Sequence, residues 1–357
     1  MVVGGTACGG DLGTVEDRSF EIRDFRLQNG TMMPRVTLAY ETYGDLAADG
    51  RNAVLITHGY TNGHHAAGRN PVNGNQPGWW DGLIGPGKAI DTGRLYVVSS
   101  NMLGSSSGST NGASIDPNTG RPYGPDFPAI TVRDIVAAQK ALLDGLGVAA
   151  VGGPSFGGYQ AFEWAVSYPD FIDAIVAAVT APMARGDIEE SLAELTDRLA
   201  TDREWNGGQY YDSGGAKTVL TELRIETLKR YGIEAALADR HPGREAREAA
   251  IRELAADWAG RFDANSLVIL RRATIGYDTV KDFRKIKAKV LYVLCRTDRL
   301  FPPAIAPGVM NALDAAGVEA RYFEIDSELG HSASGPEHAN WSPVLRAFLA
   351  PLMPAPG

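Results

Sequence analysis

Short apolar runs alternate with amphipathic stretches along most of this 357-residue chain, and that alternation predicts strands followed by helices. The predicted strands are residues 20–27, 36–43, 53–57, 95–99, 148–152, 172–179, 290–295 and 320–325. The predicted helices outside the middle of the chain are residues 131–146, 158–166 and 342–349. Strands that alternate with helices form a mostly parallel sheet flanked by helices, so the pattern predicts an α/β fold.

The alternation stops in the middle of the chain, where the pattern is helical and no convincing strand occurs. The predicted helices there are residues 188–200, 218–231, 244–262 and 266–275. A helical block inserted into an α/β core is typical of a lid over an active site. We therefore divide the chain into a flexible, glycine-rich leader (residues 1–17), a core (residues 18–182 and 286–357) and a helical lid (residues 183–285).

A serine flanked by glycines lies between one predicted strand and the helix that follows it. Residues 153–157 read Gly-Pro-Ser-Phe-Gly, after the strand at 148–152 and before the helix at 158–166. Strand, tight turn and helix are the context of a nucleophile elbow, which exposes a serine hydroxyl at the top of a sheet. Ser155 is therefore the candidate nucleophile, and the alternative is an ordinary turn with a surface serine.

A serine nucleophile needs a base and an acid that orients the base, and after an elbow these follow in the order acid, then histidine. His331 follows the last predicted strand, from which it could reach the elbow. His241 lies in the lid and His338 in a polar turn, so His331 is the candidate base. Asp298 follows the preceding strand and is the candidate acid, with a turn aspartate paired to a neighbouring arginine as the alternative.

Backbone N–H groups complete such a site by stabilising the oxyanion that forms during acyl transfer. One donor comes from the residue after the nucleophile, and the other from the loop after an earlier strand. The first is Phe156, and the second is Tyr60 in the sequence His-Gly-Tyr that directly follows the strand at 53–57. The candidate oxyanion hole is therefore formed by the N–H groups of Tyr60 and Phe156.

Composition narrows the function classes. A net charge of −9 and a pI near 5.3 argue against a nucleic-acid surface, which would need a basic patch. Two cysteines make no disulfide framework, and no apolar stretch approaches the length of a membrane span. The N-terminus lacks the basic and apolar regions of a signal peptide, so we expect a cytoplasmic enzyme.

The sequence predicts no cofactor. No G-x-G-x-x-G pattern opens a helix after a strand, which argues against a dinucleotide site. His64 and His65 are adjacent and would point apart on regular structure, and no paired cysteines or carboxylate cluster accompany them in the sequence. We therefore predict no bound metal.

Several long strings resemble the homoserine O-acetyltransferase family of the α/β-hydrolase fold, from about residue 20 to the C-terminus. The most specific are Gly-Trp-Trp-Asp-Gly-Leu-Ile-Gly-Pro-Gly-Lys-Ala-Ile-Asp-Thr at 78–92, Asp-Phe-Pro-Ala-Ile-Thr-Val-Arg-Asp at 126–134, Ser-Asn-Met-Leu-Gly at 100–104, Gln-Ala-Phe-Glu-Trp-Ala at 160–165 and Trp-Asn-Gly-Gly-Gln-Tyr-Tyr at 205–211. The resemblance implies a ping-pong reaction in which the serine takes an acyl group from acyl-CoA, a co-substrate, and passes it to an alcohol. Ser155, Asp298 and His331 fall on the family's triad, and Tyr60 falls on its oxyanion position. The resemblance also favours a homodimer through the lid helices 188–200 and 218–231.

Two positions depart from the family pattern. Members that acylate homoserine carry a lid arginine shortly before the Trp-Asn-Gly-Gly string, where this chain has Thr196 and, two residues on, Arg198. They also carry an aspartate after the catalytic histidine, where this chain has Ser332. These three residues and Tyr211, in the lid string, are the candidate substrate contacts.

The two missing charges are those that would hold a zwitterionic amino acid. The sequence therefore favours a serine ester hydrolase acting on a substrate other than a homoserine ester. The first alternative is an acyl-CoA-dependent O-acyltransferase acting on homoserine or another alcohol. A non-catalytic binding protein on the same fold is the second, and the ordered serine, aspartate and histidine argue against it.

Overall fold

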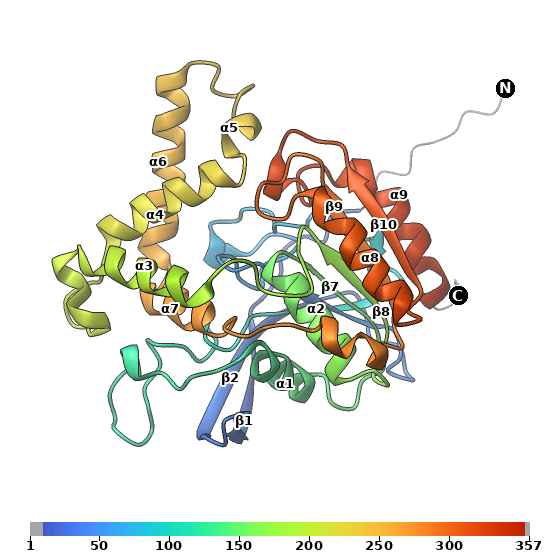
Figure 1. Cartoon of the computed structure of the whole chain (residues 1–357), viewed down its shortest axis with the longest axis horizontal. Helices are drawn as coiled ribbons and strands as arrows, with labels where there is room; N and C mark the ends of the chain where they lie inside the picture. Colours follow the sequence, from blue (N-terminus) through green and yellow to red (C-terminus); the bar gives the residue numbers. More distant parts are fainter. Residues whose placement is uncertain (1–9, 354–357) are drawn as a thin grey trace.

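The computed structural model describes residues 10–353. At its centre lies a sheet of eight strands in the order β1-β2-β6-β3-β7-β8-β9-β10 (Figure 1). The strands are β1 (Arg18–Arg26), β2 (Met32–Tyr43), β3 (Ala53–Thr57), β6 (Tyr96–Ser100), β7 (Val148–Pro154), β8 (Ile172–Ala178), β9 (Lys289–Cys295) and β10 (Ala320–Ile325). The pairs β1–β2 and β2–β6 are antiparallel, and every pair from β6 to β10 is parallel. Two short strands, β4 (Ile84–Gly85) and β5 (Ile90–Asp91), pair separately.

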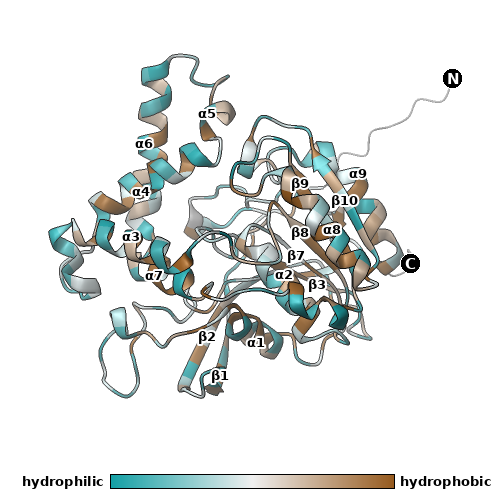
Figure 2. Cartoon of the chain, viewed as in Figure 1, coloured by the Kyte–Doolittle hydropathy of each residue, from teal (hydrophilic) through white to brown (hydrophobic). Residues whose placement is uncertain are grey.

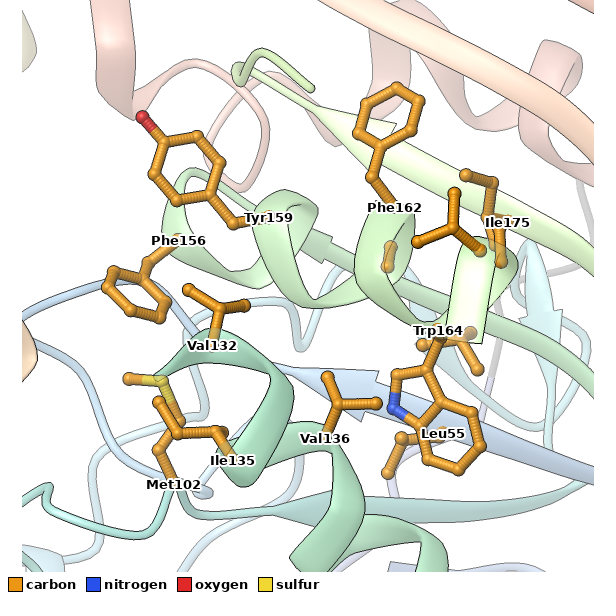
Figure 3. Close-up of a cluster of buried hydrophobic side chains, with 14 of the residues drawn as sticks. Leu55, Met102, Val132, Ile135, Val136, Phe156, Tyr159, Phe162, Trp164 and Ile175 are labelled. Carbon is orange, nitrogen blue, oxygen red and sulfur yellow. The ribbon is translucent and has the colours of Figure 1, made fainter. Parts of the chain in front are cut away.

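Helices cover both faces of the sheet because the central strands are apolar on both sides. The core helices are α1 (Val132–Leu142), α2 (Phe156–Ser167), α8 (Ala306–Ala315) and α9 (His338–Leu349). Along β3, Leu55 faces the cluster that includes α1 and α2, while Val54 and Ile56 face the opposite cluster, which includes α9. Figure 3 shows part of the first cluster, with Trp164 of α2 near Leu55 and Phe162 of the same helix near Ile175. Hydrophobic residues accordingly concentrate in the strands at the centre (Figure 2).

The segment between β8 and β9 is helical. Its helices are α3 (Ile188–Ala200), α4 (Lys217–Arg230), α5 (Ile233–Ala236), α6 (Arg244–Arg261) and α7 (Ala264–Arg272). Helix α4 packs against α6 and α3 against α7, and the far part of α6 projects away from the sheet with α5 (Figure 1). The Trp-Asn-Gly-Gly string stabilises this lid, because Trp205 is buried and Asn265 Nδ2 donates to Gly208 O at 2.9 Å.

The N-terminal part of the described chain is packed on the core. The predicted leader covers residues 1–17, of which residues 1–9 lie outside the described region. Val15 is buried and its N–H donates to Arg69 O at 2.9 Å, while Asn70 Nδ2 donates to Asp17 Oδ1 at 2.8 Å. These contacts attach residues 14–17 to the core, and the flexibility of the leader stays a prediction.

Sequence reasoning also missed helix α8. Its second and third residues are Pro307 and Gly308, which interrupt a helical pattern when read from sequence alone. Pro307 occupies the first turn, where a missing N–H costs no intrahelical hydrogen bond. The helix covers part of the face that carries α2, and it contacts β10 at the edge of the sheet.

Candidate active site

Ser155 occupies a strained turn between β7 and α2. Its φ of 58° and ψ of −120° are outside the regions that most residues favour, as a sharp strand-to-helix turn requires. The turn lies against the end of β3: a Cβ on Gly153 would be 1.9 Å from Thr57 O, and one on Gly157 would be 2.4 Å from the same atom. Both positions therefore need glycine, and the close approach holds Ser155 at the carboxyl edge of the sheet.

Ser155, His331 and Asp298 lie in hydrogen-bond contact. His331 Nε2 is 2.9 Å from Ser155 Oγ, and His331 Nδ1 is 2.9 Å from Asp298 Oδ2. The three residues follow β7, β10 and β9, and the parallel pairing of those strands brings their carboxyl ends to one edge of the sheet. This is the spacing that a nucleophile, a base and an orienting acid need.

Asp298 is held in place by backbone donors. It is 2% exposed, and its Oδ1 accepts hydrogen bonds from the N–H groups of Leu300 at 2.8 Å and Phe301 at 3.2 Å. The other oxygen is left to His331. An anion oriented in this way selects the imidazole tautomer with a proton on Nδ1 and stabilises the imidazolium that forms when Nε2 takes the serine proton.

The loop after β3 lies beside the nucleophile. A Cβ on Gly59 would be 3.6 Å from Ser155 Cβ, and the rings of Tyr60 and Phe156 stack with centroids 6.3 Å apart. Within residues 10–353, no hydrogen bond uses the backbone N–H of Tyr60 or of Phe156. Both candidate oxyanion donors are therefore available next to Ser155.

His58 supports this loop in its neutral form. It is fully buried, and its Nε2 accepts from the Met102 N–H at 3.1 Å, so its Nδ1 carries the proton and donates to Gly59 O at 2.8 Å. Burial lowers the pKa of His58 from its usual 6.5 to about 4. The hydrogen bond to Gly59 therefore persists at neutral pH and fixes the backbone just before Tyr60.

Two cavities meet at Ser155. The first, of about 310 Å³, is also lined by His331, Ser332 and Arg224, and we call it the acceptor cavity. The second, of about 280 Å³, is lined by the aromatic rings of Phe156, Tyr159, Tyr231 and Phe301 and by three arginines; we call it the donor cavity. The arginines are Arg185, Arg230 and Arg271. Tyr60, Ser155 and Tyr231 line both cavities, so a group bound in either one can reach the serine.

Arg224 is a cation without a counter-ion. It comes from α4 and is half-buried, with its Nη1 donating to Thr61 Oγ1 at 2.8 Å and its guanidinium 4.9 Å from the ring centre of Trp258. Its Nε is buried without a hydrogen-bond partner, and no carboxylate in residues 10–353 forms an ion pair with it. Burial lowers the pKa of Arg224 from its usual value, since desolvation disfavours the charged form. A charge kept there at this cost is typical of a site for an anionic ligand.

Sequence reasoning missed Arg224, although a signal was present. In α4 the residue lies four positions after Leu220 and four before Leu228, both of which are buried. An arginine at that spacing interrupts the apolar face of a helix, and such an interruption marks a side chain with a polar task.

A cluster of polar groups lies under the N-terminal segment. Asp17, Glu41 and His64 each offer a ligand atom within 4.8 Å of the others, so the fold brings together with His64 two carboxylates that lie far from it in the sequence. Hydrogen bonds use these atoms: His64 Nε2 is 3.0 Å from Asp17 Oδ1, and Asn70 Nδ2 donates to both carboxylates. The bond with His64 lowers the pKa of Asp17. The network accounts for the cluster as a structural feature that ties the N-terminal segment to β2.

Comparisons with known proteins find the same fold and related enzymes. A family model described as alpha/beta hydrolase fold matches residues 52–335. The homoserine O-acetyltransferase of Moorella thermoacetica is 37% identical over an alignment of 368 positions, gaps included, which covers 96% of this chain and 98% of that protein. The crystal structure of esterase E22 is 30% identical with a TM-score of 0.85, covering 94% of this chain and 100% of that chain. The structure of homoserine O-acetyltransferase from Bacillus anthracis is 28% identical with a TM-score of 0.85, covering 94% of this chain and 98% of that chain.

The chain belongs to the homoserine O-acetyltransferase-like family of the α/β-hydrolase fold. It is an enzyme, and its family includes both acyltransferases and esterases in the comparisons above. None of the helices in residues 10–353 combines the length and apolar character needed to cross a membrane.

The structure does not place three of the four candidate substrate contacts at the nucleophile. Thr196 is exposed and its hydroxyl donates to Leu192 O, while Arg198 pairs with Glu226 at 2.9 Å on the lid surface. Neither lines a cavity that Ser155 lines. Tyr211 hydrogen-bonds with Asp263 and Asn265 inside the lid and is likewise absent from both cavities. Ser332 alone lines the acceptor cavity.

The comparisons contradict the prediction of a hydrolase acting on an ester other than a homoserine ester. Relatives that are 34–37% identical over nearly the whole chain are homoserine O-acetyltransferases, which favours the acyltransferase alternative. The prediction rested on two missing charges, and one of them is present in the structure. Arg224 supplies the positive charge from a different lid helix than the one that carries Thr196.

Proposed function

We propose that this enzyme is an acyl-CoA-dependent O-acyltransferase that transfers an acetyl group to the hydroxyl of homoserine. The observation that carries the proposal is Arg224, an arginine with no carboxylate partner in the described chain, in a cavity that also contains Ser155 and His331. Arginine binds carboxylates through parallel hydrogen bonds, and homoserine carries a carboxylate close to its hydroxyl. The names of the relatives support the same acceptor.

The donor cavity supports an acyl-CoA as the source of the acyl group. The aromatic rings that line it suit the acyl-pantetheine arm of CoA. Arg185, Arg230 and Arg271 offer positive charge to the CoA phosphates. Arg185 and Arg230 are exposed, which places charge toward the opening, and Arg271 lies deeper, 5.2 Å from the ring of Tyr60. No carboxylate in residues 10–353 forms an ion pair with any of the three.

The first half-reaction loads the serine. Ser155 Oγ attacks the thioester carbonyl as His331 Nε2 takes its proton, and the N–H groups of Tyr60 and Phe156 stabilise the oxyanion. The tetrahedral intermediate collapses by breaking the carbon–sulfur bond. His331 returns the proton to the departing thiolate, which leaves free CoA thiol and an acyl-Ser155 ester.

The second half-reaction reverses these roles with a new nucleophile. The acceptor carboxylate binds Arg224, and its hydroxyl gives a proton to His331 Nε2 while attacking the acyl carbonyl. Collapse breaks the bond to Ser155 Oγ, which regains the proton from His331. The products are the O-acyl acceptor and free enzyme. A reducing cytoplasmic location is part of the proposal, and the buried, unpaired thiol of Cys295 agrees with it.

The direct test measures free thiol release from acetyl-CoA with and without homoserine, together with mass spectrometry of the product. We expect release that depends on homoserine and yields O-acetylhomoserine. Thiol release at the same rate without homoserine would mean thioester hydrolysis and would contradict the proposal. So would the absence of thiol release in a protein that still cleaves p-nitrophenyl acetate.

Removing the two rim arginines should weaken the acyl-CoA specifically. We expect Arg185→Ala combined with Arg230→Ala to raise the KM for acetyl-CoA by about 100-fold or more, since each charge-assisted bond to a phosphate is worth about 1.5–3 kcal/mol and the double variant removes two of them. The KM for p-nitrophenyl acetate, a donor without phosphates, should change by less than about twofold. Steady-state kinetics with the two donors measures both values.

The matched control is Arg244→Ala, because Arg244 is exposed at the start of α6 and lines neither cavity. Its KM for acetyl-CoA should equal that of the unmodified enzyme. Equal KM values for acetyl-CoA in the double variant and this control would show that phosphates do not bind at the donor cavity.

A further inference from the structure

The acceptor cavity contains one charged side chain that can bind a ligand ion, and it is positive. Among the described residues that line it, Arg224 is the only arginine, and none is an aspartate or a glutamate. Its other polar side chains away from the catalytic pair are neutral: Tyr60, Thr61, Asn62, Trp79, Trp80, Tyr231, Ser332 and Ser334. The donor cavity is also lined by positive charge only: its described lining residues include three arginines and no aspartate or glutamate.

The nearest anion of the active site is not available to a ligand. Asp298 Oδ2 is 2.9 Å from His331 Nδ1, and Asp298 Oδ1 accepts from two backbone N–H groups. The side chain is completely covered, because it lies behind His331 as seen from Ser155. On the lid, Glu226 is paired with Arg198 and lies outside both cavities. An ammonium group beside Ser155 would therefore meet no counter-charge.

The charges around the acceptor cavity favour binding of the carboxylate end of an amino acid over its ammonium end. A carboxylate completes the charge balance of Arg224, whose Nε has no hydrogen-bond partner in the described chain. An ammonium group gains only neutral hydroxyls and water, and it is repelled by the same arginine. The carboxylate then supplies the binding energy and the hydroxyl is the group that reacts, so an acceptor needs no ammonium group in order to bind and react.

We propose that the acceptor cavity recognises the carboxylate and the hydroxyl of its substrate but not an ammonium group. The substrate class is short hydroxycarboxylates, of which homoserine is one member and in which the amino group is dispensable. The inference rests on the proposed acyltransferase function and specifies how that function selects its acceptor.

Three acceptors separate the contributions of the two ends. With acetyl-CoA as donor, kcat/KM is measured for homoserine, for 4-hydroxybutanoate, which lacks the ammonium group, and for 3-aminopropan-1-ol, which lacks the carboxylate. We expect 4-hydroxybutanoate to lie within about tenfold of homoserine. We expect 3-aminopropan-1-ol to be at least about 10³-fold worse, because a site built to bind a polar group rejects analogues without it by about 10⁴–10⁵.

Introducing a carboxylate should create the missing selectivity. Ser332 lines the acceptor cavity next to the catalytic histidine, so Ser332→Asp adds a negative charge where Ser332→Asn, of nearly the same size, adds none. We expect the ratio of kcat/KM for homoserine to that for 4-hydroxybutanoate to rise at least about tenfold in S332D and to stay unchanged in S332N. Because the readout is a ratio, a general loss of activity does not affect it.

The outcomes are distinct. A loss of about 10³-fold or more for 4-hydroxybutanoate relative to homoserine would overturn the inference, since an unrecognised group cannot contribute so much. If no acceptor supports thiol release, the proposed function fails and a second readout decides the inference. Inhibition of p-nitrophenyl acetate cleavage by homoserine and by 4-hydroxybutanoate gives the same ranking without CoA, and a strong preference for homoserine there would also overturn it.

Discussion

Replacing Ser155 with alanine should lower kcat for acyl transfer by at least about 10⁴-fold, because the covalent intermediate can no longer form. Ser155 Oγ is 2.9 Å from His331 Nε2 and is the only serine hydroxyl that the base contacts in the described chain. Alanine keeps the Cβ, so the strained backbone of the turn stays as it is. Stopped-flow measurement of thiol release from acetyl-CoA should lose its burst, and intact-protein mass spectrometry should no longer detect an acetylated enzyme.

The control for this variant lies at the other end of the same helix. Ser167 ends α2 and its Oγ donates to Glu163 at 2.5 Å, away from the site. Ser167→Ala should acylate and turn over at the normal rate. Retention of the burst in a folded Ser155→Ala protein would assign the nucleophile elsewhere and refute the reading of the elbow.

The catalytic residues could be predicted from the sequence because the order of the strands largely determines where the loops that carry them lie. Each member follows a predicted strand, buried for Ser155 and Asp298 and at the sheet edge for His331, and parallel strands bring such loops to one edge. Ser155 had a local motif, whereas His331 and Asp298 were chosen from their positions after strands. The structure places the three within hydrogen-bond distance, as that reasoning requires.

The acceptor contacts could not be predicted in the same way. They depend on how lid helices pack over the sheet, and that packing is set by contacts distant in sequence. Arg224 reaches the site because α4 packs against α6, where Trp258 lies under its guanidinium. Spacing to the Trp-Asn-Gly-Gly string predicts Thr196 and Arg198 as contacts, but α3 carries both on the lid surface.

The net charge of the chain also gives no indication that the active site is positively charged. The chain has a net charge of −9, and yet the cavities that meet at Ser155 are lined by four arginines: Arg185, Arg224, Arg230 and Arg271. Composition averages over the surface, whereas a cleft concentrates the field of the few charges that line it. An acidic protein can therefore place positive charge on both sides of one nucleophile.

Replacing Gly153 with alanine should destabilise the fold by more than about 4 kcal/mol. The added Cβ would lie 1.9 Å from Thr57 O and 2.5 Å from Thr57 Oγ1, far inside any allowed contact. Thr57 cannot move easily, since it ends β3 in the middle of the sheet and its hydroxyl donates to Gly157 O at 2.9 Å. The clash must be relieved by shifting β7, which carries Ser155, so any protein that does fold should also lose acylation.

Urea unfolding followed by circular dichroism, with thiol release measured on the folded fraction, tests both effects. The matched control is Gly308→Ala in α8, where an added Cβ meets no heavy atom within 4 Å. That change should raise the free energy of unfolding by about 0.5–1 kcal/mol, since alanine restricts the unfolded chain and favours helix. A Gly153→Ala protein as stable and active as this control would show that β3 and the elbow are not in contact. The elbow depends on that contact because the backbone of Thr57 fills the space that a side chain at position 153 would occupy.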